Sequence, residues 1–265
     1  MPKKLTSDTI GTPKPSSKSS KNNEIYDFYQ HKDIQKHLTK YHNPHFKEHQ
    51  INIPFRMGLI GSSSSGKTQL LLNIISKMNN TFGHIIVVYK TTEPLYEFLA
   101  DKIGAKKITF YTKLHELPQP NDLDKKYKEK QVLLIFDDQI NEPEKAQEII
   151  KEYHIRGRKI CAGVSMCYLS QSFFKIPKII RQQFNYLVLL KLSSKRDLNL
   201  VLSDFSLGVD RDEIALLYKE ATAKKFDFLK IDIDNPNDNR KFSHNFTGFF
   251  HLDDDDEDAT DDDES

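Results

Sequence analysis

Short apolar runs alternate with segments of helical periodicity over most of the chain. Continuous apolar runs, rich in Val, Ile and Leu, predict strands at residues 55–60, 84–90, 108–113, 131–138, 161–172, 186–192 and 226–233. Between these runs, Leu and Ile recur at helical spacing in residues 69–78, 94–102, 142–153, 173–183, 193–206 and 210–223. Strands that are apolar throughout are buried on both faces. The pattern therefore predicts an α/β fold, with a mainly parallel sheet and helices on both of its faces.

The turn between the first predicted strand and the first predicted helix, GSSSSGKT, matches the Walker A or P-loop pattern G-x-x-x-x-G-K-[ST]. Gly61 and Gly66 allow the backbone conformations that point successive N–H groups at a phosphate. We expect Lys67 to reach the β- and γ-phosphate oxygens and the hydroxyl of Thr68 to ligate Mg²⁺. The motif therefore predicts a nucleotide site formed by Gly61, Ser62, Ser63, Ser64, Ser65, Gly66, Lys67, Thr68 and Gln69.

A second motif, QVLLIFDD, is an apolar strand that ends in two acids, which is the Walker B arrangement. Asp137 is expected to hold the water shell of Mg²⁺ opposite Thr68, and Asp138 to orient or activate the attacking water. Many hydrolytic motors carry Glu at the second position, and the side chain of Asp is one methylene shorter. Glu142 and Glu144 therefore stay as alternative bases.

The order of the motifs separates the classes of P-loop protein. A whole strand–helix unit lies between Walker A and Walker B, and a strand with a polar end follows Walker B. This order indicates the additional-strand (RecA/FtsK-like) class of P-loop NTPases, which hydrolyse ATP. In that class the strand that ends near Gln171 lies between the Walker A and Walker B strands. Gln171 is therefore predicted to approach the γ-phosphate and to report its presence.

Other P-loop proteins lack support in the sequence. A GTPase would be expected to carry N-K-x-D, together with D-x-x-G after the Mg²⁺ aspartate, and an ABC-type ATPase would carry a signature that begins L-S-G-G-Q; none of these stands here. A small-molecule kinase stays an alternative because Arg156, Arg158 and Arg181 could clamp a second phosphate. The acid pair and the strand that ends in Gln favour a hydrolytic motor instead.

The net charge of +1 conceals an uneven distribution along the chain. Ten of the 38 acidic residues lie in residues 253–265, and the other 28 acids stand against 39 Lys and Arg, so the rest of the chain carries about +11. A basic body suits binding to nucleic acid, and a solvated lysine-rich surface explains the same excess equally well.

Composition also predicts how the chain is divided. The expected parts are a disordered basic tail rich in Ser, Lys and Pro at 1–23, a short helical and connector segment at 24–50, a P-loop ATPase domain at 51–235, a C-terminal extension at 236–252 and a disordered acidic tail at 253–265. The chain shows neither the apolar core of a secretory signal nor a run of about 18 apolar residues, so we expect no membrane insertion. Cys161 and Cys167 are predicted to be reduced, buried thiols of a cytosolic or nuclear protein.

Four segments in order, GSSSSGKT, LLIFDD, IRGRK and YLSQSFFKIPKIIR, resemble the genome-packaging ATPases of large eukaryotic DNA viruses and their smaller relatives. These proteins form the poxvirus-type branch of the FtsK/HerA superfamily of P-loop ATPases, and the resemblance runs from Pro54 to about Ile233. It implies a ring-forming, ATP-driven translocase, expected as a hexamer, that moves double-stranded DNA into a capsid. It also implies a capsid or portal partner, and a location at the viral assembly site in the cytoplasm or nucleus of the infected cell, or on the virion.

The resemblance extends to individual residues. Gln171 matches the family's sensor glutamine, and Arg156 or Arg158 matches an Arg-Gly-Arg motif that could supply an arginine finger to the neighbouring subunit. The structural alternative for the two arginines is that a helix C-terminus favours cations. Relatives often carry His directly after the second Arg, where this chain has Lys159. That departure bears on the assignment of the finger more than on the fold.

The DNA-contacting surface is the least specific expectation. Lys175, Lys178 and Arg181 recur at three-residue intervals in the helix predicted at 173–183, so they would share one face and could follow DNA phosphates. A solvated basic stripe explains the same spacing. The functional alternatives are a nucleotide-switched interaction protein without translocation, and a DNA helicase with the same core.

Overall fold

The computed structural model describes residues 26–251 of the chain. The tails expected at 1–23 and 253–265 lie outside the described residues. The described residues up to Lys40 belong to a small separate unit. This unit contains the 3₁₀ turn η1 (Phe28–Gln30) and the short helix α2 (Lys32–Gln35). The second unit begins at Tyr41 and contains every other element.

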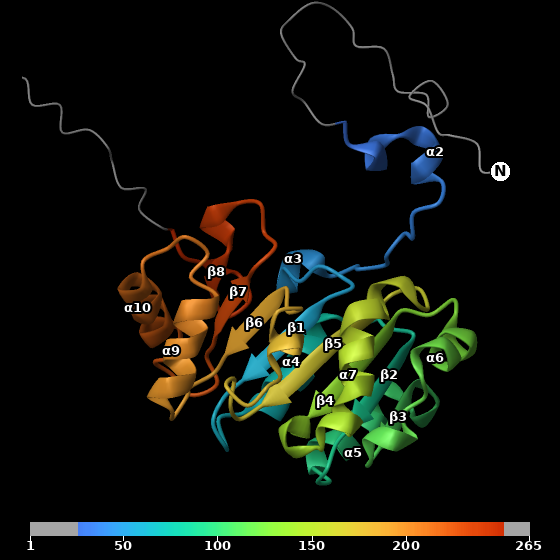
Figure 1. Cartoon of the computed structure of the whole chain (residues 1–265), viewed down its shortest axis with the longest axis horizontal. Helices are drawn as coiled ribbons and strands as arrows, with labels where there is room; N and C mark the ends of the chain where they lie inside the picture. Colours follow the sequence, from blue (N-terminus) through green and yellow to red (C-terminus); the bar gives the residue numbers. More distant parts are fainter. Residues whose placement is uncertain (1–25, 252–265) are drawn as a thin grey trace, which may run out of the picture. The chain divides into compact units, whose positions relative to one another are not determined.

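A single mixed sheet organises the second unit (Figure 1). Its order is β3-β2-β4-β5-β1-β6-β7-β8-β9. The pairs from β3 to β6 are parallel, and those from β6 to β9 are antiparallel. The strands are β1 (Arg56–Ile60), β2 (His84–Val88), β3 (Ile108–Tyr111), β4 (Val132–Asp137), β5 (Val164–Ser170), β6 (Tyr186–Leu189), β7 (Leu229–Asp232), β8 (Phe242–His244) and β9 (Gly248–Phe249).

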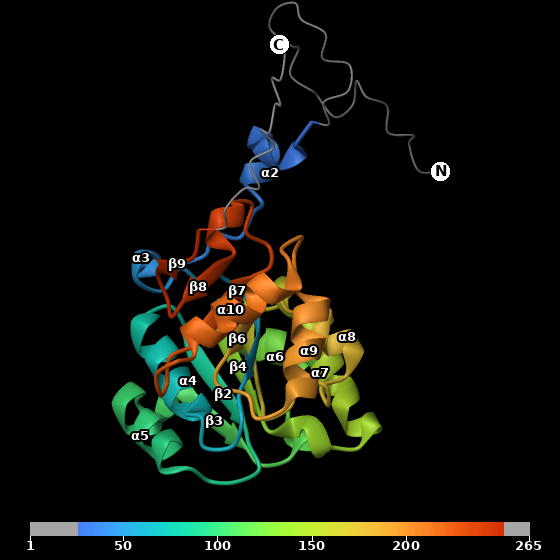
Figure 2. The same ribbon diagram turned by 90° about the vertical axis from the view of Figure 1, so that its left-hand side faces the viewer.

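Helices cover both faces of this sheet, as Figure 2 shows from the side. The apolar faces of α4 and α5 join one core cluster, and those of α6, α7, α9 and α10 join the other. Their bounds are α3 (Phe46–His49), α4 (Lys67–Lys77), α5 (Pro94–Ile103), α6 (Pro120–Tyr127), α7 (Glu144–Arg156), α8 (Lys178–Arg181), α9 (Lys195–Asp204) and α10 (Arg211–Ala221). The predicted fold class, an α/β P-loop NTPase of the additional-strand type, is confirmed.

The central strands are mostly apolar because they have no solvent face. Every residue of β2 and β5 is buried, and so are all residues of β4 except its last, Asp137. Successive side chains of a strand point to opposite faces, so each of these strands feeds both clusters. In β4, Leu134 packs in one cluster and Ile135 in the other.

Two expected elements differ from the structure, and one helix was not expected. The helix expected at 173–183 is only α8, because Pro177 precedes it in an extended conformation (ψ 135°) and disfavours helix in the residue before it. The run at 226–233 forms β7, but it is not the last strand, since β8 and β9 extend the sheet. Sequence reading also missed α6, whose buried Leu123 and Tyr127 are spaced one turn apart in an otherwise polar segment.

The cysteines also differ in part from the expectation. Cys167 is buried in β5, and Cys161 is half-buried before that strand, at a positive φ of 56°. Both thiols are free, and burial raises the pKa of Cys161 to about 12. The expected shared strand is therefore wrong for Cys161, while the expected reduced state agrees with the structure.

Candidate functional site

The P-loop joins the end of β1 to the start of α4. Ser64 and Gly66 have positive φ values of 60° and 98°, a conformation that Gly adopts without strain. The Nζ of Lys67 donates to the carbonyl oxygens of Gly61 and Ser62 at 3.0 and 3.1 Å. The first N–H groups of α4 have no partner inside the helix. The loop and the helix N-terminus together suit a phosphate group.

The Walker B acid lies against the same space. Asp137 ends β4, and it lines a cavity of about 360 Å³ together with Lys67 and Thr68. Its Oδ2 accepts a hydrogen bond of 2.6 Å from the hydroxyl of Tyr96, a buried residue of α5. Burial raises the pKa of Asp137, and the hydrogen bond from Tyr96 opposes that rise. Tyr96 therefore orients the carboxylate and favours its ionised form.

These oxygen donors fit Mg²⁺. Mg²⁺ bound to a nucleotide usually takes one or two protein ligands and completes its shell with phosphate oxygens and water. The hydroxyl of Thr68 and the carboxylate of Asp137 provide two such ligands on the same cavity. Residues 26–251 contain no cluster of three or more His, Cys, Asp or Glu side chains that would hold a metal ion without a nucleotide.

The three candidate bases have different surroundings. Asp138 has a left-handed backbone (φ 52°) directly after β4, and its carboxylate has no hydrogen-bond partner among the described residues. Glu142 forms an ion pair of 2.7 Å with Lys90. Glu144 is exposed at the start of α7 and does not line the cavity. Of the three, Asp138 is the one that lines the cavity with its carboxylate unpaired.

Gln171 follows β5 directly and lines the same cavity. β5 pairs with β4 on one side and with β1 on the other, so Gln171 lies between the two Walker motifs as the strand order predicts. The next turn is held by α9: the Oδ1 of Asp197 accepts from the Ser172 hydroxyl at 2.9 Å and from the Phe174 N–H at 2.7 Å. The position of Gln171 is therefore coupled to α9.

The two arginines of the Arg-Gly-Arg motif lie at the other end of β5. Arg156 ends α7, and Arg158 lies in the 3₁₀ turn η5 (Gly157–Lys159) that precedes β5. A strand rises about 3.3 Å per residue, so about 20 Å of β5 separates these arginines from Gln171. Arg156 donates to Asn121 and pairs with Glu152.

Arg158 is exposed and makes no hydrogen bond or ion pair with other described residues. Burial and the nearby Arg158 lower the pKa of the Arg56 guanidinium in β1. Neither Arg156 nor Arg158 lines the nucleotide cavity.

The three basic residues assigned to DNA do not share a helix face, because Lys175 precedes Pro177 and lies outside α8. That premise of the sequence reading is wrong. Lys175 and Lys178 are exposed. The Arg181 side chain is mostly buried, pairs with Asp204 at 3.3 Å and stacks over the ring of Phe173. Lys175 and Lys178 are the members of this set that face solvent.

Sequence reasoning missed the cavity residues that come from the segment after β2. Lys90, Thr91 and Glu93 line the cavity. Tyr96 does not line it but donates a hydrogen bond to Asp137, which does. Burial lowers the pKa of Lys67, and the carboxylates of Asp137, Asp138 and Glu93 oppose this shift. The place of these residues depends on β2 lying parallel beside β4, which the sequence alone does not show.

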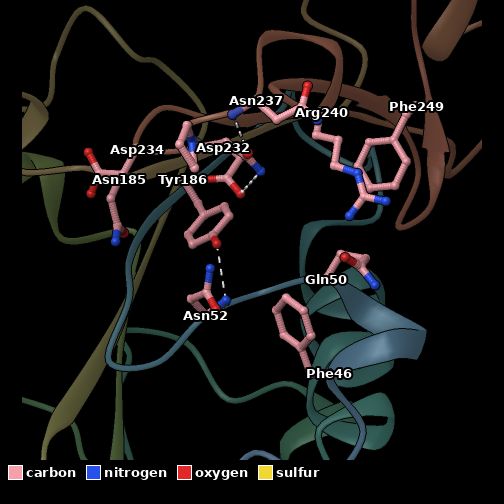
Figure 3. A pocket seen from close by; sticks show the side chains of 12 residues that line it. Phe46, Gln50, Asn52, Asn185, Tyr186, Asp232, Asp234, Asn237, Arg240 and Phe249 are labelled. Carbon is pink, nitrogen blue, oxygen red and sulfur yellow. Dashed lines mark hydrogen bonds between the residues drawn. The ribbon is translucent and has the colours of Figure 1, made fainter. Parts of the chain in front are cut away.

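A second cavity, of about 470 Å³, lies at the opposite edge of the sheet (Figure 3). It is formed around the start of β6 and the end of β7, where Tyr186 and Asp232 lie side by side. Asp232 accepts from the Asn235 amide at 3.0 Å, and the Tyr186 hydroxyl accepts from the Asn52 N–H at 3.0 Å. Two carboxylates, Asp232 and Asp234, line this cavity beside one arginine, so it does not suit a polyphosphate.

None of the described helices is both long and apolar enough to span a lipid bilayer. The crystal structure of B204, the DNA-packaging ATPase from Sulfolobus turreted icosahedral virus, matches the fold with a TM-score of 0.52 and 18% identity. The match covers 74% of this chain and 98% of that chain, and at this identity it supports the fold alone.

Viral proteins match the sequence itself. The chain is 26% identical over 201 residues to "DNA packaging protein OPG160" of vaccinia virus (strain Copenhagen). The matched region covers 71% of this chain and 72% of that protein. The monkeypox virus protein of the same name is 26% identical over 201 residues, or 71% of this chain and 65% of that protein. The family model described as "Poxvirus A32 protein" matches residues 43–232. The chain therefore belongs to the Poxvirus A32 protein family, as the resemblance had implied.

Proposed function

We propose that the chain is an ATP-hydrolysing DNA translocase that packages double-stranded viral DNA into a capsid and works as a ring of identical subunits. The observation that carries the proposal is the convergence of the P-loop, the two acids after β4 and Gln171 on one cavity. The strand order β4-β5-β1 produces that convergence. The names of the vaccinia and monkeypox relatives support DNA packaging as the task.

The residues of the cavity divide the work of ATP hydrolysis. Lys67 exchanges its two carbonyl partners for the β- and γ-phosphate oxygens. Mg²⁺, when bound by Thr68 and Asp137, neutralises charge on those phosphates. Asp138 accepts the proton of the attacking water, because its carboxylate lines the cavity without a partner of its own.

Gln171 senses the γ-phosphate through its side-chain amide. Its loop is tied to α9 through Ser172 and Asp197, so a shift of Gln171 is transmitted to the exposed segment that contains Lys175 and Lys178. These two lysines are the DNA contacts that we retain from the three expected. Arg181 has a structural role instead, because it forms an ion pair with Asp204.

Arg158 completes the site of a neighbouring subunit. It lies about 20 Å from the nucleotide cavity of its own chain along β5, and its guanidinium has no partner among the described residues. In a ring, the amino edge of one sheet faces the nucleotide cavity of the next subunit. Arg158 then adds positive charge where the transition state spreads negative charge. The hexamer, a portal or capsid partner, and a place at the viral assembly site belong to the same proposal.

The test is steady-state ATP hydrolysis with and without long double-stranded DNA, at two salt concentrations, beside Lys67→Ala. A translocase is expected to hydrolyse ATP several-fold faster with DNA. Salt should weaken the stimulation because phosphate contacts release counterions. Lys67→Ala should abolish the rate at unchanged fold, measured by circular dichroism.

Other outcomes identify the alternatives. Hydrolysis by an assembled oligomer that ignores DNA at low salt would favour a nucleotide-switched interaction protein. Separation of the strands of a forked duplex would favour a helicase. Transfer of the γ-phosphate to a small molecule, rather than to water, would favour a kinase.

A further inference from the structure

A third cavity touches the P-loop from the side opposite to the catalytic acids. Its volume is about 340 Å³, and it shares Ser63 and Ser64 with the catalytic cavity. Its other wall comes from the end of β6 and from the segment between α10 and β7, residues 222–227. The two cavities therefore meet over the loop that is expected to hold the phosphates.

Hydrogen bonds hold both walls of this third cavity, one of them to the P-loop itself. The carbonyl oxygen of Lys191 accepts from the Ser62 N–H at 3.1 Å and from the Ser62 hydroxyl at 2.9 Å. Asp227 accepts from His244 and Asn245, at 3.0 and 3.1 Å. These contacts hold both sides of the cavity in place, so a ligand meets a formed surface.

Phe226 is the unusual residue of this wall. Its φ of 74° is rare for an aromatic residue, and its side chain is 46% exposed. The ring lies directly against the P-loop, because a Cβ atom at Gly66 would lie 2.4 Å from its Cδ1. The Nζ of Lys225 lies 4.9 Å from the ring centroid. A strained backbone that presents an exposed aromatic ring beside a phosphate loop indicates a role in binding.

We propose that this cavity binds the base of the nucleotide and that the ring of Phe226 stacks on it. An aromatic face and nearby lysines suit a flat heterocycle attached to a phosphate chain. The catalytic cavity offers the opposite chemistry, since Glu93, Asp137 and Asp138 face it with carboxylates. A nucleotide that lies across Ser63 and Ser64 places its γ-phosphate toward those acids and its base toward Phe226.

Recognition is through the face of the base more than through its edge. The hydroxyl of Thr222 donates to the Tyr218 carbonyl oxygen, and Asp227 is engaged by His244 and Asn245. The polar side chains of Thr222 and Asp227 in this wall are thus already hydrogen-bonded within the chain. The assignment rests on the proposed function, because it deepens the same nucleotide site.

The test compares the affinity for ATP with that for inorganic tripolyphosphate, which has the phosphates and no base. Phe226→Ala is expected to weaken ATP binding about tenfold, as loss of one base stack does, and to leave tripolyphosphate binding unchanged within twofold. Phe226→Trp restores the affinity for ATP because it keeps an aromatic face. Phe98→Ala is the matched control: Phe98 is also exposed (53%) and lies under Lys102, but it is in α5, away from this cavity.

The outcomes separate this site from the function on which it rests. Unchanged ATP affinity in Phe226→Ala would overturn the base site and leave the ATPase intact. An equal loss for ATP and tripolyphosphate would also overturn it, since the ring would then only support the P-loop. If the wild-type chain bound no ATP, the proposed function would fail first, and the base site with it.

Discussion

The two edges of the sheet carry different groups, although the parallel strands run from one edge to the other. At the carboxyl edge, the segments after β1, β2, β4 and β5 bring the half-buried Lys67 and the carboxylates of Glu93, Asp137 and Asp138 to the nucleotide cavity. At the amino edge, the structure has a cavity with two carboxylates, and η5 with an unpaired Arg158. No arginine lines the nucleotide cavity among residues 26–251. A single subunit therefore has the parts that bind and activate, while its free arginine lies at the far edge.

The largest effect is expected at the amino edge. Arg158→Ala should lower the rate of ATP hydrolysis by about 1,000-fold, the scale of an arginine finger. Arg156→Ala should change it only a few-fold, because Arg156 is engaged by Asn121 and Glu152. Steady-state hydrolysis by the assembled oligomer measures both.

Mixing the inactive Arg158→Ala and Lys67→Ala proteins tests whether the finger acts between subunits. One kind of interface in the mixture contains both an intact Lys67 and an intact Arg158, so part of the activity should return. If the mixture stays inactive although both variants assemble, the finger does not act in trans.

The next effect concerns Asp138, the proposed proton acceptor at the carboxyl edge. Asp138→Asn should lower the rate of hydrolysis by about 100-fold while ATP still binds, because the variant removes the proton acceptor. Glu142→Gln should stay within about twofold, since Glu142 is paired with Lys90. A larger loss for Glu93→Gln than for Asp138→Asn would instead identify Glu93, in the segment after β2, as the proton acceptor.

A smaller, pH-dependent effect is expected for Tyr96, which donates a hydrogen bond to Asp137. The hydrogen bond from Tyr96 lowers the pKa of Asp137 against the effect of burial. Tyr96→Phe should therefore raise that pKa and move the acidic limb of the pH–rate profile to higher pH, with about a threefold loss at neutral pH. A uniform loss at every pH would contradict this role and indicate a packing defect.

The smallest catalytic effect is expected in the cavity of Figure 3. Asp232→Ala should leave the rate of ATP hydrolysis within twofold and lower the free energy of unfolding by about 2 kcal/mol, because it leaves the Asn235 amide without its acceptor. Chemical denaturation measures the second value. A tenfold loss of hydrolysis at unchanged stability would show that this edge serves the subunit's own site.

The parallel core was predictable because a strand buried on both faces is apolar along most of its length. β2, β4 and β5 carry that pattern, and the P-loop between β1 and α4 has a spacing that few other turns share. The helix α6 and the length of α8 were not predictable in this way. Their limits depend on two buried side chains in a polar segment and on the backbone of Pro177.

The residues of the candidate site also fall into two groups, those that the sequence identifies and those that it does not. Lys67, Thr68, Asp137, Asp138 and Gln171 could be chosen from sequence because each directly follows a recognisable strand or loop. Glu93 and Tyr96 could not, since their place depends on which strand lies beside β4. Phe226 could not either, because its ring reaches Gly66 across about 160 residues of chain.

By itself, the sequence determined the strands, the phosphate loop and the acids that follow β4, because local spacing and burial dictate them. Only the tertiary structure decided what meets at each edge of the sheet. It brought Tyr96 to Asp137, held the Gln171 loop through Asp197, and placed Arg158 at the far end of β5. The reason is physical: strand order is set by the packing of helices on both faces, and contacts between strand ends depend on that order.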